Sequence, residues 1–401
     1  MVAVKRLLKA VIFGVSLLVL LVLKLLRPLV RVRLMIIGFH KFGHLALEPD
    51  LALLKIAEEK KAKNSRFPLD CYVWSLGPKR LRSNQVLARL WKQRLRVLPS
   101  WLIDGFFNVG KVFNALALEI PKHSIHGPAN NQISTSAPLT LSRQQCNEAR
   151  AGMSAMGLDP DRPFVCLIVR DSGHNADPSG VEHPEYEFRN FDVDVFTEVA
   201  IAMCERGFQV VRMGAGKEKP FTLQHQGVFD YATSIHRTEL LDIYLAANCS
   251  FAVSTQTGPD AVCLLFRRPV CFVDIPIFSQ FFFGTGLAIW NPTIYVQNGE
   301  KLSLRKIIDS DLVWIKTTDD LLQQQIEGIR SKPSELTENV LSFIDYLESA
   351  KQLVAEDLRL SEKANSIVTA GMASRGEEVF GQILARFNPS FLRRNAHWFL
   401  Q

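Results

Sequence analysis

The stretch STQTGPDAVC combines residue types and spacing suited to binding chemistry. It begins at residue 254, directly after the apolar run CSFAVS, and leads into an apolar stretch typical of a helix. Pro259 suits the first turn of that helix, and Thr257 or Gly258 can serve as its N-cap. Amide groups and the helix dipole at such a start can bind an anion, for example a diphosphate. The predicted anion-binding residues are Ser254, Thr255, Gln256, Thr257 and Gly258. The alternative is an ordinary helix cap.

Three arginines lie at positions from which they could bind the same anion. Arg170 and Arg212 fall at or near the ends of predicted strands, and Arg189 precedes a predicted helix. A guanidinium matches the geometry of phosphate oxygens. Ordinary surface arginines are the alternative. The nearby GAGKEKP loop is not a phosphate-binding P-loop, because Lys217 is followed by Glu218 rather than Ser or Thr.

The first half offers proton-transfer groups in the loop FHKFGHLALEPD, which follows the first predicted strand. These groups are His40, His44, Glu48 and Asp50. Histidine and glutamate can act as general bases when their pKa values are suitable, although a structural histidine is the alternative. We predict no metal site: Asp192 and Asp194 resemble a DxD pair, but they stand at a helix start, where Asp serves as a cap.

The elements that position these groups alternate between strands and helices. Strands are predicted at RLMIIG, DCYVWSLG, RVLPSW, FVCLIV, FQVVRMG, SFAVS and PVCFVD, with helical patterns between them and a helical tail. This alternation predicts an α/β fold with parallel sheets, whose ligands lie beyond the carboxyl ends of the strands. The predicted parts are an anchor at 1–30, a Rossmann-like domain at 31–138, a second Rossmann-like domain at 139–335, and helices at 336–401 that pack back on the first domain. The polar stretch 121–138 is the predicted linker.

The first 30 residues predict a membrane-associated helix. An apolar core is preceded by Lys5, Arg6 and Lys9 and followed by Lys24, Arg27, Arg31 and Arg33. Such flanks suit a helix that spans a bilayer or lies in one leaflet, and their slight bias favours a cytoplasmic body at the inner (cytoplasmic) membrane. A buried core helix is the alternative. No small-residue cleavage site supports a signal peptide.

Composition narrows the partners. The 401 residues carry a net charge of +7, which suits an anionic partner, but no basic run interleaved with aromatic residues indicates nucleic acid. The seven cysteines show no metal-ligand spacing and no disulfide framework, which indicates a reducing compartment.

Several segments resemble a family of bacterial glycosyltransferases of surface polysaccharide biosynthesis. They are FGHLALEPD, FRNFDVDVF, ERGFQVVRMG, HRTELLDIYLAANCSFAVSTQTG and NPSFLRRNAHWF. The resemblance runs from about residue 33 onward, is most specific over 188–275, and extends distantly to heptosyltransferases. It implies the GT-B fold, in which two Rossmann-like domains face a cleft, with acceptor on the N-terminal half and nucleotide-sugar on the C-terminal half.

By this resemblance, residues 254–258 cradle the donor diphosphate, and Arg170, Arg189, Asn190 and Arg212 line the donor side. His44 or Glu48 would be the base of an inverting reaction. No cofactor is implied beyond the nucleotide-sugar co-substrate. The expected function is metal-independent sugar transfer to a glycan or lipid-linked acceptor at the membrane. A sugar-nucleotide epimerase and an inactive GT-B scaffold in a polysaccharide assembly complex are the alternatives.

Overall fold

The computed structural model describes residues 2–61, 69–121, 135–174, 183–215, 219–276, 288–315, 317–349, 352–374 and 386–401. The chain forms two compact units. Unit 1 comprises Met1–Gly127 with Pro138–Thr140, and unit 2 comprises Pro128–Ala137 with Leu141–Gln401. The predicted linker at 121–138 lies mostly outside the described residues.

Unit 1 is built on two parallel strands, β1 (Val30–Ile36) and β2 (Leu69–Ser75). Single parallel bridges extend this sheet on both sides, at Arg33–Glu119 and at Trp74–Val97. The segment RVLPSW therefore contributes one bridge rather than the strand we predicted, since Pro99 and the start of a helix follow at once. The helices of this unit, besides the N-terminal one, are α2 (Phe42–Lys61), α3 (Gln85–Arg94) and α4 (Ser100–Val112).

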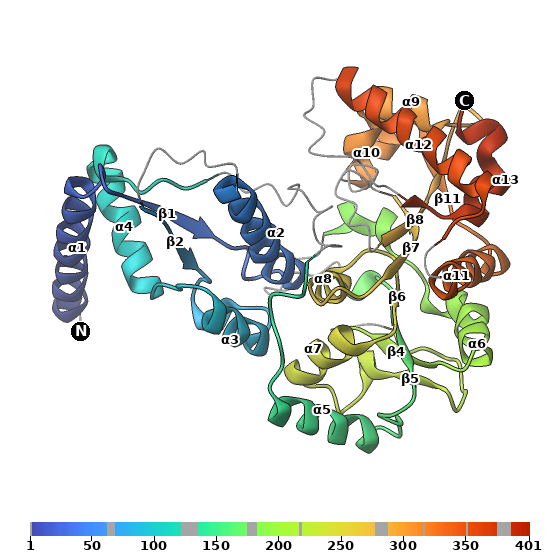
Figure 1. Cartoon of the computed structure of the whole chain (residues 1–401), viewed down its shortest axis with the longest axis horizontal. Helices are drawn as coiled ribbons and strands as arrows, with labels where there is room; N and C mark the ends of the chain where they lie inside the picture. Colours follow the sequence, from blue (N-terminus) through green and yellow to red (C-terminus); the bar gives the residue numbers. More distant parts are fainter. Residues whose placement is uncertain are drawn as a thin grey trace. The chain divides into compact units, whose positions relative to one another are not determined.

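The N-terminal helix α1 (Val2–Leu25) packs on α4 (Figure 1). Leu20 of α1 is buried with Leu34 of β1 and with Ile103, Phe106 and Val109 of α4. The described residues contain one helix long and apolar enough to cross a membrane, by length and composition, and it is this one, Ala3–Leu25. Much of its outer surface is exposed.

Unit 2 is built on a seven-stranded parallel sheet with the order β12-β8-β7-β6-β3-β4-β5. The α/β class with a parallel sheet is thus confirmed. The strands are β3 (Phe164–Ile168), β4 (Gln209–Met213), β5 (Val228–Asp230), β6 (Ala252–Ser254), β7 (Val270–Ile275), β8 (Ala288–Pro292) and β12 (Arg386–Phe387). Every residue of β3, β4, β6 and β7 is buried, as expected for largely apolar strands of a parallel sheet that is covered on both faces.

Helices cover both faces of this sheet (Figure 1). On one face, α6 (Thr197–Glu205) and α11 (Pro333–Glu348) bury Met203 and Phe343 against Val165 and Val210. On the other face lie α5 (Arg143–Ala155), α7 (Glu239–Asn248) and α8 (Gly258–Leu265), which contact one another in sequence. This sandwich fixes the carboxyl ends of the strands, where the candidate site begins.

The C-terminal part contains short strands as well as the expected helices. A small antiparallel sheet of β9 (Ile294–Gln297), β10 (Glu300–Lys301) and β11 (Ile326–Ile329) lies beside α9 (Leu304–Asp309) and α10 (Thr318–Gln323). Two more helices follow, α12 (Ala355–Ser374) and α13 (Pro389–Phe399), and β12 pairs with β8 just before α13. The helical reading of RF at 386–387 was therefore wrong. α12 and α13 contact each other, and α11 contacts α6. The packing of this tail on the N-terminal domain stays a prediction.

Candidate functional site

The polar turn after β6 is held together by a buried carboxylate. Oδ2 of Asp260, in the first turn of α8, accepts a 2.7 Å hydrogen bond from Ser254 Oγ and a 2.7 Å bond from the Thr257 amide. Ser254 Oγ in turn accepts from the Gln256 amide at 2.9 Å. Thr257 is the N-cap of α8, as predicted. Most amide groups of this turn are thus satisfied internally, which leaves less free backbone for an anion than the sequence suggested.

Asp260 itself is 7% exposed, and burial raises the pKa of its carboxyl group to about 6. The hydrogen bond from Ser254, the amide of Thr257 and the charge of Arg189 counter part of that rise. Sequence analysis quoted this residue within its motif but assigned it no role. Its position three residues after the N-cap, where carboxylates commonly bond back to the cap, was the available signal.

The backbone at Gln256 brings the turn and an arginine together. Gln256 adopts a left-handed conformation with φ of 69°, which is uncommon for a residue other than glycine. Its carbonyl oxygen accepts a 2.9 Å hydrogen bond from the guanidinium of Arg189. Strain of this kind is concentrated at functional sites in proteins. Gln256 therefore presents its carbonyl, and not its side chain alone, to the candidate site.

Arg170 follows β3 at the same edge of the sheet. Its amide donates a 2.8 Å hydrogen bond to Thr255 Oγ1, and its carbonyl accepts from the Phe191 amide at 2.8 Å. Burial lowers the pKa of its guanidinium to about 10, and the positive charge of Arg189 lowers that pKa further in the same direction. The buried Nε of Arg170 has no hydrogen-bond partner among the described residues.

Arg189 ends the short 3-10 helix η5 (Pro184–Arg189) and is half-buried beside the turn. Burial lowers the pKa of its guanidinium, and the nearby Asp260 carboxylate partly opposes that shift. Its buried Nε also lacks a partner in the part of the chain that the structure describes. Two cations in mutual repulsion, Arg170 buried and Arg189 half-buried beside the start of α8, form an arrangement that an anion would stabilise.

Arg212 has a different environment. Its side chain is fully buried in β4, and its guanidinium donates to the Lys219 carbonyl at 2.5 Å and to Asp230 at 3.2 Å. A longer contact of 3.5 Å joins it to Asp171. Through these hydrogen bonds Arg212 connects the ends of β3, β4 and β5. Its predicted contact with a donor is not tested by these distances, but they favour a positioning role.

The remaining predicted groups of unit 2 lie nearby. Asn190 follows η5 directly and is half-buried. Asp192 caps the next 3-10 turn, η6 (Val193–Phe196), by accepting from the Asp194 amide, as the sequence predicted. Both carboxylates also pair with Lys219 Nζ, at 3.0 and 3.1 Å. Lys217 lies outside the described residues. Among the described residues no cluster of three or more His, Cys, Asp or Glu could hold a metal ion.

Unit 1 carries a histidine–glutamate pair at the carboxyl end of β1. His44 Nδ1 lies 2.6 Å from Glu48 Oε1, and Glu48 Oε2 accepts a 2.6 Å hydrogen bond from the Gly38 amide. Because a carboxylate accepts hydrogen bonds, this pairing places a hydrogen on Nδ1, and in the neutral imidazole the lone pair is then on Nε2. The His44 side chain is 36% exposed and that of Glu48 14%. His44 therefore has the arrangement of a general base, with Glu48 orienting it.

Glycine at position 38 allows this pair to form. A Cβ placed on Gly38 would lie 2.8 Å from the Cβ of His44, closer than real carbon contacts allow. The other two acid–base candidates are placed differently. His40 is exposed and lies edge-on to Phe39, and Asp50 is buried within α2. Only His44 and Glu48 of the four are paired with each other.

No protein-family model matches the chain, and no curated protein matches its sequence. Among solved structures, the glycosyl transferase family 9 protein from Veillonella parvula DSM 2008 is 12% identical, with a TM-score of 0.39 over 66% of this chain and 86% of that chain. The E. coli ADP-heptose LPS heptosyltransferase II is 15% identical, with a TM-score of 0.33 over 60% and 84%.

A third similar structure is the dodecameric iron-containing heptosyltransferase TibC in complex with ADP-D-β-D-heptose. It is 14% identical, with a TM-score of 0.34, and the match covers 65% of this chain and 62% of that chain. The structures found are glycosyltransferases, two of them heptosyltransferases, which is the group of distant similarity stated from the sequence.

Proposed function

We propose that this chain is a glycosyltransferase of the GT-B type, which moves a sugar from a nucleoside diphosphate sugar to the hydroxyl group of a glycan or lipid-linked acceptor. The observation that carries the proposal is the pair of arginines Arg170 and Arg189 beside the start of α8, each with a buried Nε atom. Both lack a hydrogen-bond partner at Nε among the described residues. A diphosphate supplies the negative charge and the acceptor oxygens that these two cations need.

The turn would complete the diphosphate site. Gly258 opens α8 and presents no side chain, so a phosphate can approach the backbone there. Ser254 and Asp260 hold the turn in shape rather than bind the ligand directly. In this proposal Thr255, Gln256 and Thr257 border the phosphates, Asn190 flanks them, and Arg212 positions the strand ends.

The reaction that fits these groups is a single displacement. His44 Nε2 takes the proton of the acceptor hydroxyl as the hydroxyl oxygen bonds to the anomeric carbon of the donor. The bond between that carbon and the phosphate oxygen breaks, and the nucleoside diphosphate leaves with the electron pair. Arg170 and Arg189 stabilise the charge that develops on it. Configuration at the anomeric carbon is inverted, and no metal is required.

The N-terminal helix gives this enzyme a place to act. Helix α1 is apolar and is flanked by basic residues, which supports attachment to the inner membrane with the body of the protein in the cytoplasm. A lipid-linked acceptor of surface polysaccharide biosynthesis would then be presented at the same surface.

Calorimetry with UDP, GDP, ADP and CMP tests the donor site. We expect one nucleoside diphosphate to bind, and Arg170→Gln and Arg189→Gln each to weaken it about 10- to 100-fold, the range that a charged hydrogen bond supplies. Arg143→Gln, which removes an exposed arginine at the start of α5, is the matched control and should not change the affinity. Failure of all these nucleotides to bind would refute the proposal.

A further inference from the structure

The outer face of α1 is a continuous apolar stripe. Its exposed members repeat at alternating intervals of four and three residues, and each is at least 43% exposed; they are Val4, Leu8, Val11, Val15, Leu18, Val22 and Leu25. At 3.6 residues per turn these side chains share one face. By the same spacing Arg6 and Lys9 fall on the side away from the stripe and Lys5 falls on its flank, and all three side chains are exposed. The helix therefore separates an apolar face from a cationic face near its N-terminus.

The inner face of α1 is fastened to unit 1. Ser16 is buried against α4, where Gly105 leaves room for it: a Cβ on Gly105 would lie 2.0 Å from Ser16 Oγ. If α1 crossed a bilayer in this packing, α4 would have to enter the hydrocarbon with it. The exposed side chains of Asp104, Asn108 and Lys111 on α4 make that very costly. The packed helix instead suits a position in the plane of one leaflet.

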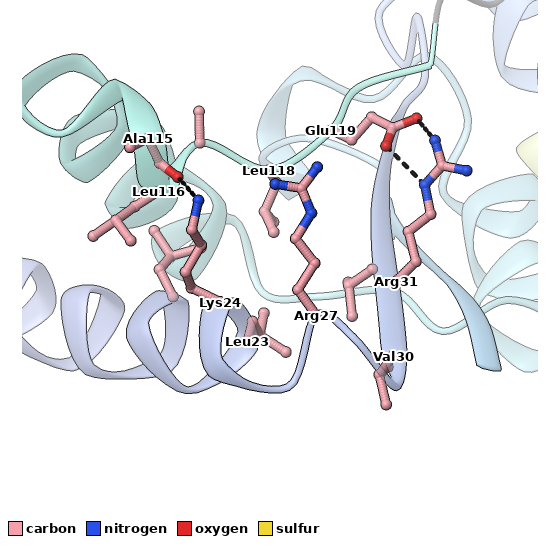
Figure 2. A pocket seen from close by; sticks show the side chains of 12 residues that line it. Leu23, Lys24, Arg27, Val30, Arg31, Ala115, Leu116, Leu118 and Glu119 are labelled. Carbon is pink, nitrogen blue, oxygen red and sulfur yellow. Dashed lines mark hydrogen bonds and ion pairs between the residues drawn. The ribbon is translucent and has the colours of Figure 1, made fainter. Parts of the chain in front are cut away.

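A basic pocket opens where the apolar stripe ends (Figure 2). It has a volume of about 160 Å³ and is lined by the end of α1, the start of β1 and residues 115–119. Lys24 Nζ donates to the Ala115 carbonyl at 3.1 Å, and Arg31 Nε donates to Glu119 at 2.8 Å. The Arg27 guanidinium points toward Leu118 between these two cations, and its side chain makes no hydrogen bond within the described residues. Three cations thus face one carboxylate.

The charge of this region selects among possible occupants of the stripe. The first 47 residues contain eight lysines and arginines and no acidic residue. A second copy of the chain packed on the stripe would bring further positive charge close, without the acidic partners that coiled-coil edges use. A leaflet with anionic lipids offers the complementary charge and an apolar interior together.

We propose that unit 1 contains an anionic phospholipid site, in which α1 lies in the plane of one leaflet and the Lys24–Arg27–Arg31 pocket binds the lipid phosphate. The apolar stripe takes the acyl chains, and Arg27 supplies the hydrogen bonds that no protein group uses. This inference rests on the membrane attachment proposed above and is independent of the nucleotide site in unit 2.

Flotation of the full chain with vesicles tests the pocket. Vesicles of phosphatidylcholine with phosphatidylglycerol should bind the protein, and vesicles of phosphatidylcholine alone should bind it at least about tenfold more weakly. Arg27→Gln should lower binding to the anionic vesicles about tenfold or more. The control Lys9→Gln removes the same charge outside the pocket and should lower it about fivefold at most, the effect of one cation near such a surface. Equal losses of vesicle binding in the two variants would show that the pocket is not a specific lipid site.

Two further measurements separate the lipid site from its rivals. Soluble glycerol phosphate, at the concentration of the accessible lipid phosphate, should not displace the vesicles; displacement would show a site for free phosphate esters instead. Leu18→Glu, at an exposed position, should abolish flotation without changing the mass measured by light scattering in detergent. If light scattering showed that Leu18→Glu turns a dimer into a monomer while the variant still floats with vesicles, the stripe would be an interface between copies of the chain.

Extraction tests the in-plane position. Alkaline carbonate should release the protein from membranes of the producing cell, whereas retention would mean that α1 spans the bilayer. Nucleoside diphosphate binding is measured on the same Arg27→Gln and Leu18→Glu samples and should equal that of the unaltered chain. Failure of the lipid site is thereby distinguished from failure of the proposed transferase function.

Discussion

Asp260 is a buried carboxyl group whose ionisation opposes the fold around it. Its pKa is raised to about 6 in the folded chain, from 3.8. Between these values the folded state binds more protons than the unfolded state, so this group's contribution to stability falls as the pH rises from about 4 to about 6. The loss is on the order of 3 kcal/mol, and above about pH 7 it is complete.

Asp260→Asn tests this assignment. The amide oxygen can still accept from Ser254 and Thr257, but it carries no charge. We expect the melting temperature of the variant to increase relative to that of the unaltered chain as the pH is raised from about 4 to 7. At higher pH the difference between the two melting temperatures should stay constant. A difference that stays constant across the range would mean that Asp260 does not ionise with a raised pKa.

The charge of Arg170 is unfavourable for folding but favourable for the proposed binding of a nucleoside diphosphate. Its lowered pKa means that burial and Arg189 disfavour the charge in the ligand-free fold. Arg170→Gln should therefore leave the free energy of unfolding in urea unchanged or raise it by roughly 1 kcal/mol, while nucleoside diphosphate affinity falls. A variant that unfolds more easily yet binds as before would assign Arg170 to the core instead of the site.

At this scale the sequence predicted positions better than roles. Arg170 and the turn at 254–258 could be found because they follow apolar strands, and the carboxyl ends of parallel strands meet at one edge. Arg212 follows the same rule, yet it lies inside β4 and is used by Asp171 and Asp230. Which side chain of a strand end is enclosed depends on the neighbouring strands, and local spacing does not contain that information.

At the scale of elements, the loops after β1 and β2 are locked together beside His44. Gly77, just after β2, has a left-handed φ of 59°, and a Cβ there would lie 2.2 Å from the ring of Phe39. Gly77→Ala adds both backbone strain and a clash. We expect a loss of at least about 2 kcal/mol in the free energy of unfolding, measured in urea.

Gly110→Ala is the control for this change, because the nearest atom to its Cβ would be 3.4 Å away. It should be neutral or slightly stabilising, since alanine favours a helix over glycine. Similar losses in both variants would show that the Phe39–Gly77 contact has no special weight.

Helix ends carry signals that can be read from the sequence, because capping depends on neighbours in sequence. Asn84 accepts from the Leu87 amide at the start of α3, Ser142 forms a capping box at the start of α5, and Gly157 has the left-handed φ that ends that helix. Strands β8 and β12 were missed for the converse reason. β12 has two residues, and it is a strand only because Phe387 pairs with Trp290, almost a hundred residues earlier.

At the scale of the whole molecule, the contacts described for the proposed nucleotide site lie within unit 2. The turn after β6, Arg170 and Arg189 are all held by groups from residues 168 to 260, and Arg267 fastens α8 to Thr135 at 3.2 Å. Unit 2 also has its own sheet, covered by helices on both faces. Unit 2 should therefore fold, and bind the nucleoside diphosphate, without unit 1.

The fragment 128–401 tests this division. We expect it to unfold in a single cooperative transition and to bind the preferred nucleoside diphosphate within about threefold of the full chain, a difference below 1 kcal/mol. Sugar transfer should be lost, because the fragment lacks the His44–Glu48 pair. A folded fragment with much weaker nucleotide binding would show that unit 1 contributes contacts to the diphosphate, whereas transfer by the fragment alone would show that the base lies in unit 2.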